Sequence, residues 1–133
     1  MPKPGTGQSP LTLLTERSQL DFELKFIGEV LERLPNYTDA LRVHATNLFT
    51  KGQLKECLLL EQRMVALRPH DPDARYSLAC RYAMLHQSDL AIETLRQALE
   101  LGFTDLRSMI QEKQLESIRR DPRFREMLKR QTV

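Results

Sequence analysis

Residues 72–103 read PDARYSLACRYAMLHQSDLAIETLRQALELGF, and this stretch decides the fold. Its apolar residues recur every three or four positions, which is the spacing of one face of an α-helix. Asp71 and Pro72 open the first helix, because Asp is a favoured N-cap and Pro a favoured first helical residue. His86 stands at the turn before the second helix, and Gly102 closes that helix. The stretch therefore predicts two antiparallel helices joined by a short turn.

The proline and glycine residues that end the helices recur at a fixed interval. Pro69 lies 34 positions after Pro35, and Gly102 with Phe103 ends the following interval. Three further helices are expected before residue 71, and their apolar residues again fall at helical spacing. A helix–turn–helix unit of about 34 residues predicts a stacked helical-repeat protein. The positions that define these helices are Leu20, Leu24, Ile27, Leu31 and Leu34; Leu41, Ala45, Leu48 and Phe49; and Leu58, Leu60, Met64, Val65 and Leu67.

The pattern of large and small residues in 72–103 resembles the tetratricopeptide repeat. In that repeat, small residues let two helices approach closely while larger ones fill the space between them. The segment 38–69 resembles it less well, because Cys57 and Met64 stand where the repeat has Ala and Glu61 stands where it has a large apolar residue. The matching positions in 72–103 are Leu78, Ala79, Tyr82, Ala91, Leu95 and Ala98.

The C-terminal segment departs from the repeat. Its Asp121-Pro122-Arg123-Phe124 resembles the start of the last helix in the cap that closes some bacterial tetratricopeptide arrays. Such a cap would cover the apolar face that the last repeat leaves in water. We therefore expect an all-α fold, a short right-handed α-solenoid. Its expected parts are a disordered tail at 1–10 and a single domain at 11–133, made of a half-repeat at 11–35, repeats at 38–69 and 72–103, and a cap at 104–131.

The resemblance implies an adaptor that binds a peptide or a partner protein in a concave groove. The first helix of each repeat lines such a groove. Arginine and aromatic residues on that face would suit a peptide with an apolar anchor and an acidic group. The expected partner-binding residues are Arg42, Thr46, Phe49, Asp73, Tyr76, Ser77, Cys80 and Met84.

The N-terminal helix suggests a second surface. The face of this helix that carries the apolar residues from Leu20 to Leu34 is its seam. The apolar surface extends beyond this seam to Phe22, Phe26 and Val30, so a single neighbouring helix cannot cover it all. Residues 11–17 could fold back over these side chains. Otherwise a second copy of the chain or a partner would cover them. The alternative function is therefore a self-assembling structural subunit, a possible homodimer.

Composition argues against other functions. The 133 residues carry a net charge of +2, too small to indicate a nucleic-acid partner. Two cysteines and three histidines show no metal-ligand spacing, and no nucleophile or phosphate-loop motif is present, so we expect no catalysis, metal or cofactor. No apolar run approaches the roughly 20 residues that span a bilayer, so we expect no membrane partner. These features and the two unpaired cysteines favour the cytoplasm.

Overall fold

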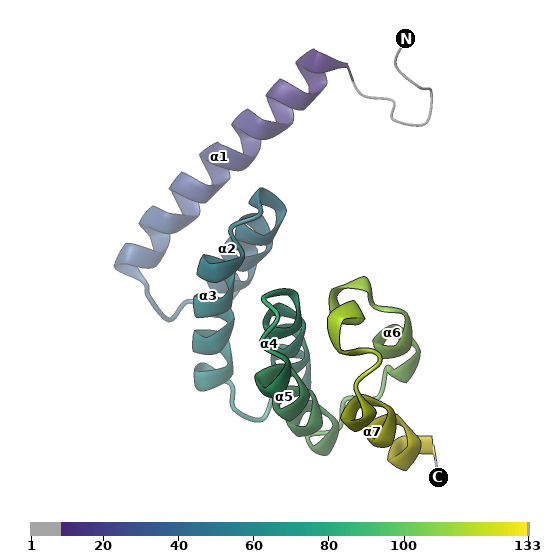
Figure 1. Cartoon of the computed structure of the whole chain (residues 1–133). Helices are drawn as coiled ribbons and strands as arrows, with labels where there is room; N and C mark the ends of the chain where they lie inside the picture. Colours follow the sequence, from purple (N-terminus) through teal and green to yellow (C-terminus); the bar gives the residue numbers. More distant parts are fainter. Residues whose placement is uncertain (1–8, 133) are drawn as a thin grey trace. The chain divides into compact units, whose positions relative to one another are not determined.

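The computed structural model describes residues 9–132, and this part of the chain is all-α with no strand (Figure 1). The prediction of an all-α fold built from antiparallel helix pairs is confirmed. Residues 1–8 of the expected tail lie outside the described residues, whereas Ser9 and Pro10 start the first helix. The elements are α1 (Pro10–Arg33), α2 (Thr38–Lys51), α3 (Leu54–Leu67), α4 (Pro72–Met84), α5 (Ser88–Glu100), α6 (Leu106–Gln111), the 3-10 helix η1 (Lys113–Ile118) and α7 (Pro122–Thr132).

The chain divides into two compact units, with the boundary after Gly52. Unit 1 contains α1 and α2, and unit 2 contains α3 to α7. The boundary falls inside the expected repeat 38–69, between its two helices.

Helix α1 of unit 1 begins ten residues before the expected apolar seam. Ser9 is its N-cap, accepting a hydrogen bond from the Thr12 amide at 3.2 Å, and Pro10 occupies the first turn. The helix then runs without a break to Arg33, and Pro35 follows its end as expected. Residues 11–17 are therefore helical and do not fold back, so the interpretation in which they cover Phe22 and Phe26 is wrong.

Helices α1 and α2 pack antiparallel. Asn47 donates a hydrogen bond to Glu23 at 3.3 Å, and Lys51, the last residue of α2, pairs with Asp21. The seam residues of α1 face this contact and are only half-buried, with Leu34 exposed at the helix end. The half-buried residues are Leu20, Leu24, Ile27 and Leu31; the buried ones of α2 are Ala40, Leu41, Ala45, Asn47 and Leu48.

In unit 2 the helix ends follow the sequence signals. Asp71 caps α4, accepting from the amides of Asp73 at 2.9 Å and Ala74 at 3.3 Å. His86 adopts a positive φ of 59° between α4 and α5, the conformation that glycine usually supplies in such a turn. The interpretation of His86 as a turn residue is confirmed.

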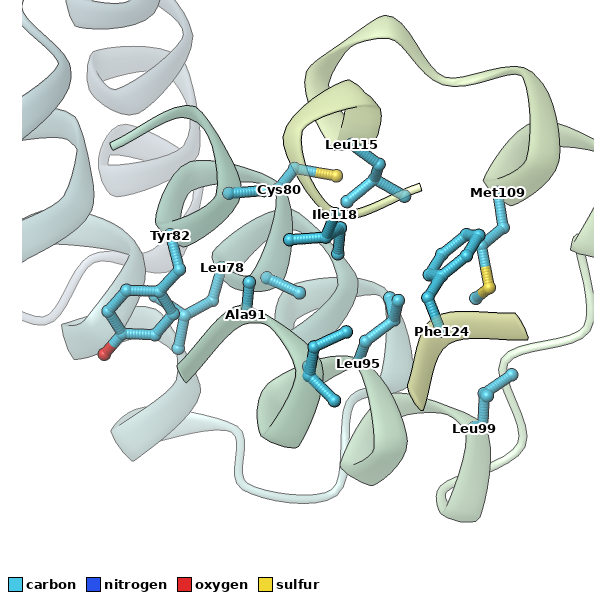
Figure 2. Close-up of a cluster of buried hydrophobic side chains, with 13 residues drawn as sticks. Leu78, Cys80, Tyr82, Ala91, Leu95, Leu99, Met109, Leu115, Ile118 and Phe124 are labelled. Atoms are coloured by element: carbon cyan, nitrogen blue, oxygen red, sulfur yellow. The ribbon is translucent and has the colours of Figure 1, made fainter. Parts of the chain in front are cut away.

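The core of unit 2 lies between α4, α5 and the C-terminal segment, as Figure 2 shows. Ala79 and Ala91 are fully buried and leave room for the two helices to approach closely. The C-terminal segment covers this pair, and Ser117 of η1 donates a hydrogen bond to the Ala83 carbonyl at 2.7 Å. Its buried residues are Met109, Leu115, Ile118 and Phe124.

Candidate functional site

The expected binding residues of unit 1 share one face of α2. Arg42 and Thr46 are exposed, and Phe49 is half-buried on the same face. The Thr46 hydroxyl donates to the Arg42 carbonyl at 3.1 Å, so this hydroxyl already has a partner within the helix. Arg42 is 3.8 Å from Asp39, but both side chains are more than half exposed, so water screens the pair. The guanidinium is therefore accessible to a partner.

An exposed apolar side chain lies beside the Arg42 guanidinium. Val43 is 45% exposed and lies next to Arg42 on the surface of α2. An exposed valine beside a cation is a combination that an amphipathic peptide with an acidic group can match. The face is short, since it spans the three turns between Asp39 and Thr50.

The expected binding residues of unit 2 lie together on α4, but the C-terminal segment covers most of their face. The Tyr76 ring stacks on Phe103, with ring centroids 4.2 Å apart and planes 10° from parallel. Cys80 is 3% exposed and belongs to the core with Leu115 and Ile118 (Figure 2). Cys80 therefore does not line an open groove, because the segment expected to cap the end of the array packs against this face.

The other three positions on α4 differ in exposure. Asp73 is exposed, whereas Ser77 and Met84 are half-buried. The Met84 sulfur accepts a hydrogen bond from Arg81 at 3.3 Å, which ties its side chain to the interior. Asp73 alone of the expected α4 residues is fully available at the surface.

A buried charge pair joins α3 to α4, and sequence reasoning did not anticipate it. Arg81 is 7% exposed and Glu61 5% exposed. The guanidinium donates to both carboxylate oxygens of Glu61, through Nε to Oε1 and through Nη2 to Oε2 at 3.2 Å. Its Nη1 donates to Gln114 Oε1 at 2.9 Å, which adds η1 to the network. A carboxylate at a position where the repeat has a large apolar residue was the available signal for this pair.

The two thiols of unit 2 are poor nucleophiles. Burial raises the pKa of Cys57 to about 12, and the adjacent Glu61 carboxylate adds to this effect. Burial likewise raises the pKa of Cys80 to about 12. The Cys57 thiol donates to Glu61 Oε1 at 3.2 Å. Both thiols remain protonated at neutral pH, and a protonated thiol is a weak nucleophile and a weak metal ligand.

A groove of about 530 Å³ lies between α5 and α7. Ile92 and Met127 contribute apolar surface to it, and its charged residues are largely paired with one another. Arg123 pairs with Asp89 at 2.9 Å and with Asp121 at 2.8 Å. The C-terminal basic run is thus partly neutralised by carboxylates of its own unit, and the groove shows no charge preference for a ligand.

Helix α1 carries the largest exposed apolar side chains of unit 1. The Phe22 and Phe26 rings stack with centroids 6.2 Å apart, and both rings are more than half exposed. Val30 is half-buried, so of the three expected self-association residues it offers the least surface.

Comparison of the sequence with models of known protein families and with curated proteins found no match. Among residues 9–132, no three His, Cys, Asp or Glu side chains gather closely enough to hold a metal ion. Within the same range, no helix has both the length and the apolar character needed to cross a membrane.

Proposed function

We propose that this chain is a protein-interaction adaptor of the tetratricopeptide-repeat type, without catalytic activity. The distribution of exposed apolar side chains carries the proposal. Among the described residues, twelve large hydrophobic side chains are exposed, and eight of them lie in unit 1. Such concentration on one part of a chain marks interaction surfaces. The eight are Leu11, Leu13, Leu14, Phe22, Phe26, Leu34, Tyr37 and Val43.

The repeat assignment draws support from unit 2. Ala79, Ala91 and Ala98 are fully buried at positions where the repeat needs small residues. The turn between α4 and α5 takes a left-handed residue where the repeat has glycine. The raised pKa values of the two thiols argue against cysteine catalysis. Two free buried cysteines also suit a reducing compartment, so we propose the cytoplasm.

The proposed partner site is the outward face of α2. Arg42 would pair with an acidic group of the partner, and Val43 would contact an apolar side chain of the partner beside it. Because α4 is largely covered by the C-terminal segment, we assign its residues a smaller part in binding. The partner is therefore a peptide or helix that presents an acidic and an apolar side chain together.

A site-specific photo-crosslinker at Thr46 tests this proposal. Crosslinking in native lysate, followed by mass spectrometry, should capture a defined protein, and Arg42→Glu should reduce the yield at least tenfold. The matched control is Arg63→Glu, which changes an exposed arginine of α3 and should leave the yield unchanged. Equal yields for the two variants would move the binding site away from α2.

A further inference from the structure

Helix α1 extends well beyond the helix that it packs against. Lys51, the last residue of α2, pairs with Asp21, so the first turns of α1 lie past the end of α2. Every residue from Ser9 to Gln19 is exposed. An unsupported helix of about ten residues is marginal in water, and most helical stability comes from packing of an apolar face. The first turns of α1 therefore need a neighbour.

One exposed stripe runs along the length of α1. Leu11, Leu14, Ser18 and Phe22 follow one another in steps of three or four, and Lys25 or Phe26 and then Glu29 continue the series. At about 100° per residue these positions stay on one side of the helix, opposite the seam that faces α2. Steps of three and four are the spacing by which two long helices pack along their length. We call Leu11, Leu14, Ser18, Phe22 and Phe26 the outward stripe.

We propose that the outward stripe binds the same stripe of a second copy, with the two α1 helices antiparallel about Ser18. This arrangement places Leu14 of each copy against Phe22 of the other. It also places Leu11 of each copy against the aliphatic stem of Lys25 of the other, with Phe26 beyond. Ser18 meets its own counterpart at the two-fold axis, where a small side chain lets the helices approach closely. A two-fold contact of this kind closes on itself and yields a dimer.

Charge favours the antiparallel orientation. Arg17 and Asp21 lie side by side on one flank of the outward stripe, four residues apart. In the antiparallel pair, Arg17 of each copy lies opposite residue 19 of the other, and its long side chain reaches two positions further to Asp21, which gives two reciprocal opposite-charge contacts. In a parallel pair this flank would face the opposite flank of the partner helix, so neither of these opposite-charge contacts would form. Although Asp21 Oδ1 already bonds Lys51, its side chain remains 57% exposed and can accept a second cation.

The available area matches a weak dimer. Leu11 is 75% exposed, Leu14 58%, Phe22 64% and Phe26 54%. Large side chains at this exposure offer on the order of 500 Å² per copy, so the pair would bury on the order of 1,000 Å². That area lies at the lower end of specific protein interfaces. We therefore expect a dissociation constant in the micromolar range.

Disulfide trapping of the full-length chain tests both the partner and the orientation. A Ser18→Cys variant should form an intermolecular disulfide on mild oxidation, because antiparallel pairing brings the two cysteines together at the axis. A Lys25→Cys variant should not crosslink to itself, because residue 25 of one copy faces residue 11 of the other. The native Cys57 and Cys80 are buried and do not compete. Crosslinking of both variants would mean a parallel pair and would overturn the orientation.

Sedimentation velocity at rising concentration measures the association itself. The wild-type chain should pass from monomer to dimer, and Phe22→Glu should raise the dissociation constant at least tenfold. The control is Leu59→Glu, which changes an equally exposed side chain, 65% accessible, on α3 of unit 2. Circular dichroism of each variant confirms that it is folded. A wild-type chain that stays monomeric at several hundred micromolar, or equal effects of the two variants, would overturn the proposal.

Discussion

Replacing Glu61 with leucine should strongly destabilise unit 2. The change leaves the Arg81 guanidinium buried with Gln114 and the Met84 sulfur but without a counter-charge. Although burial favours the neutral form, hydrogen bonds and charge from Glu61 raise the pKa of Arg81, and an arginine stays charged even when its partner is removed. Removing one partner of a buried, hydrogen-bonded pair costs about 3–5 kcal/mol. We expect a loss of this size in the free energy of unfolding.

The double variant Glu61→Leu with Arg81→Met separates the interaction energy of the charge pair from the effect of lost packing contacts. With both charges gone, apolar side chains of similar volume occupy the site, and such replacements are often neutral or stabilise a protein by about 1–4 kcal/mol. The free energy of unfolding of the double variant should therefore be no more than about 1 kcal/mol below that of the wild type. Arg81→Met alone leaves the Glu61 carboxylate buried without its counter-charge, so this single variant should also be less stable than the wild type.

Urea denaturation followed by far-ultraviolet circular dichroism measures the free energy of unfolding of the wild type, the two single variants and the double variant, which together form a double-mutant cycle. The reasoning fails if Glu61→Leu costs less than about 1 kcal/mol, since Arg81 would then be able to reach water. It also fails if the double variant loses the sum of the two single changes, because that result would mean that the two residues do not interact.

Three further predictions concern unit 2. Ala79→Leu or Ala91→Leu should each cost about 1–3 kcal/mol in urea denaturation by overpacking the fully buried contact between α4 and α5, and neutrality at both sites would contradict the repeat register. His86→Gly should raise the free energy of unfolding by about 0.5–1 kcal/mol, because glycine adopts positive φ without strain; a loss of stability would show that the imidazole makes a contact of its own. Cys57 and Cys80, each with a pKa raised to about 12, should resist iodoacetamide at pH 8 in the folded chain and react once it is unfolded, as followed by mass spectrometry; rapid labelling of the native chain would mean that unit 2 opens readily.

Local signals in the sequence predicted most helix boundaries. Asp71-Pro72 begins α4, Gly102 takes a left-handed conformation after α5, and Pro35 follows the end of α1. These signals act within one or two turns of the chain, so they can be interpreted without knowing the fold. The start of α1 was missed although Ser9-Pro10 is the same kind of signal, because the apolar series that defined this helix begins only at Leu20.

Signals within a single helix could not predict the buried pair of Glu61 and Arg81. Glu61 and Arg81 are twenty positions apart, and each is a residue type that ordinarily lies at the protein surface. Only the packing of α3 on α4 brings the carboxylate and the guanidinium together and removes both from water. The departure of Glu61 from the repeat pattern indicated an unusual position, but it did not identify the partner.

The sequence by itself determined that this chain is helical, where its helices end, and which small residues allow close contact between α4 and α5. Those properties depend on neighbours within a few residues, through capping, backbone conformation and the spacing of apolar side chains. Tertiary structure alone decided which faces stay accessible. Cys80 and Tyr76 share the helical face expected to line a groove, yet the C-terminal segment covers them, whereas Phe22 and Phe26 remain in water because residues 11–17 extend α1 instead of folding back. Exposure depends on which distant segment occupies the space beside a helix, and the spacing of residues along one helix carries no record of that segment.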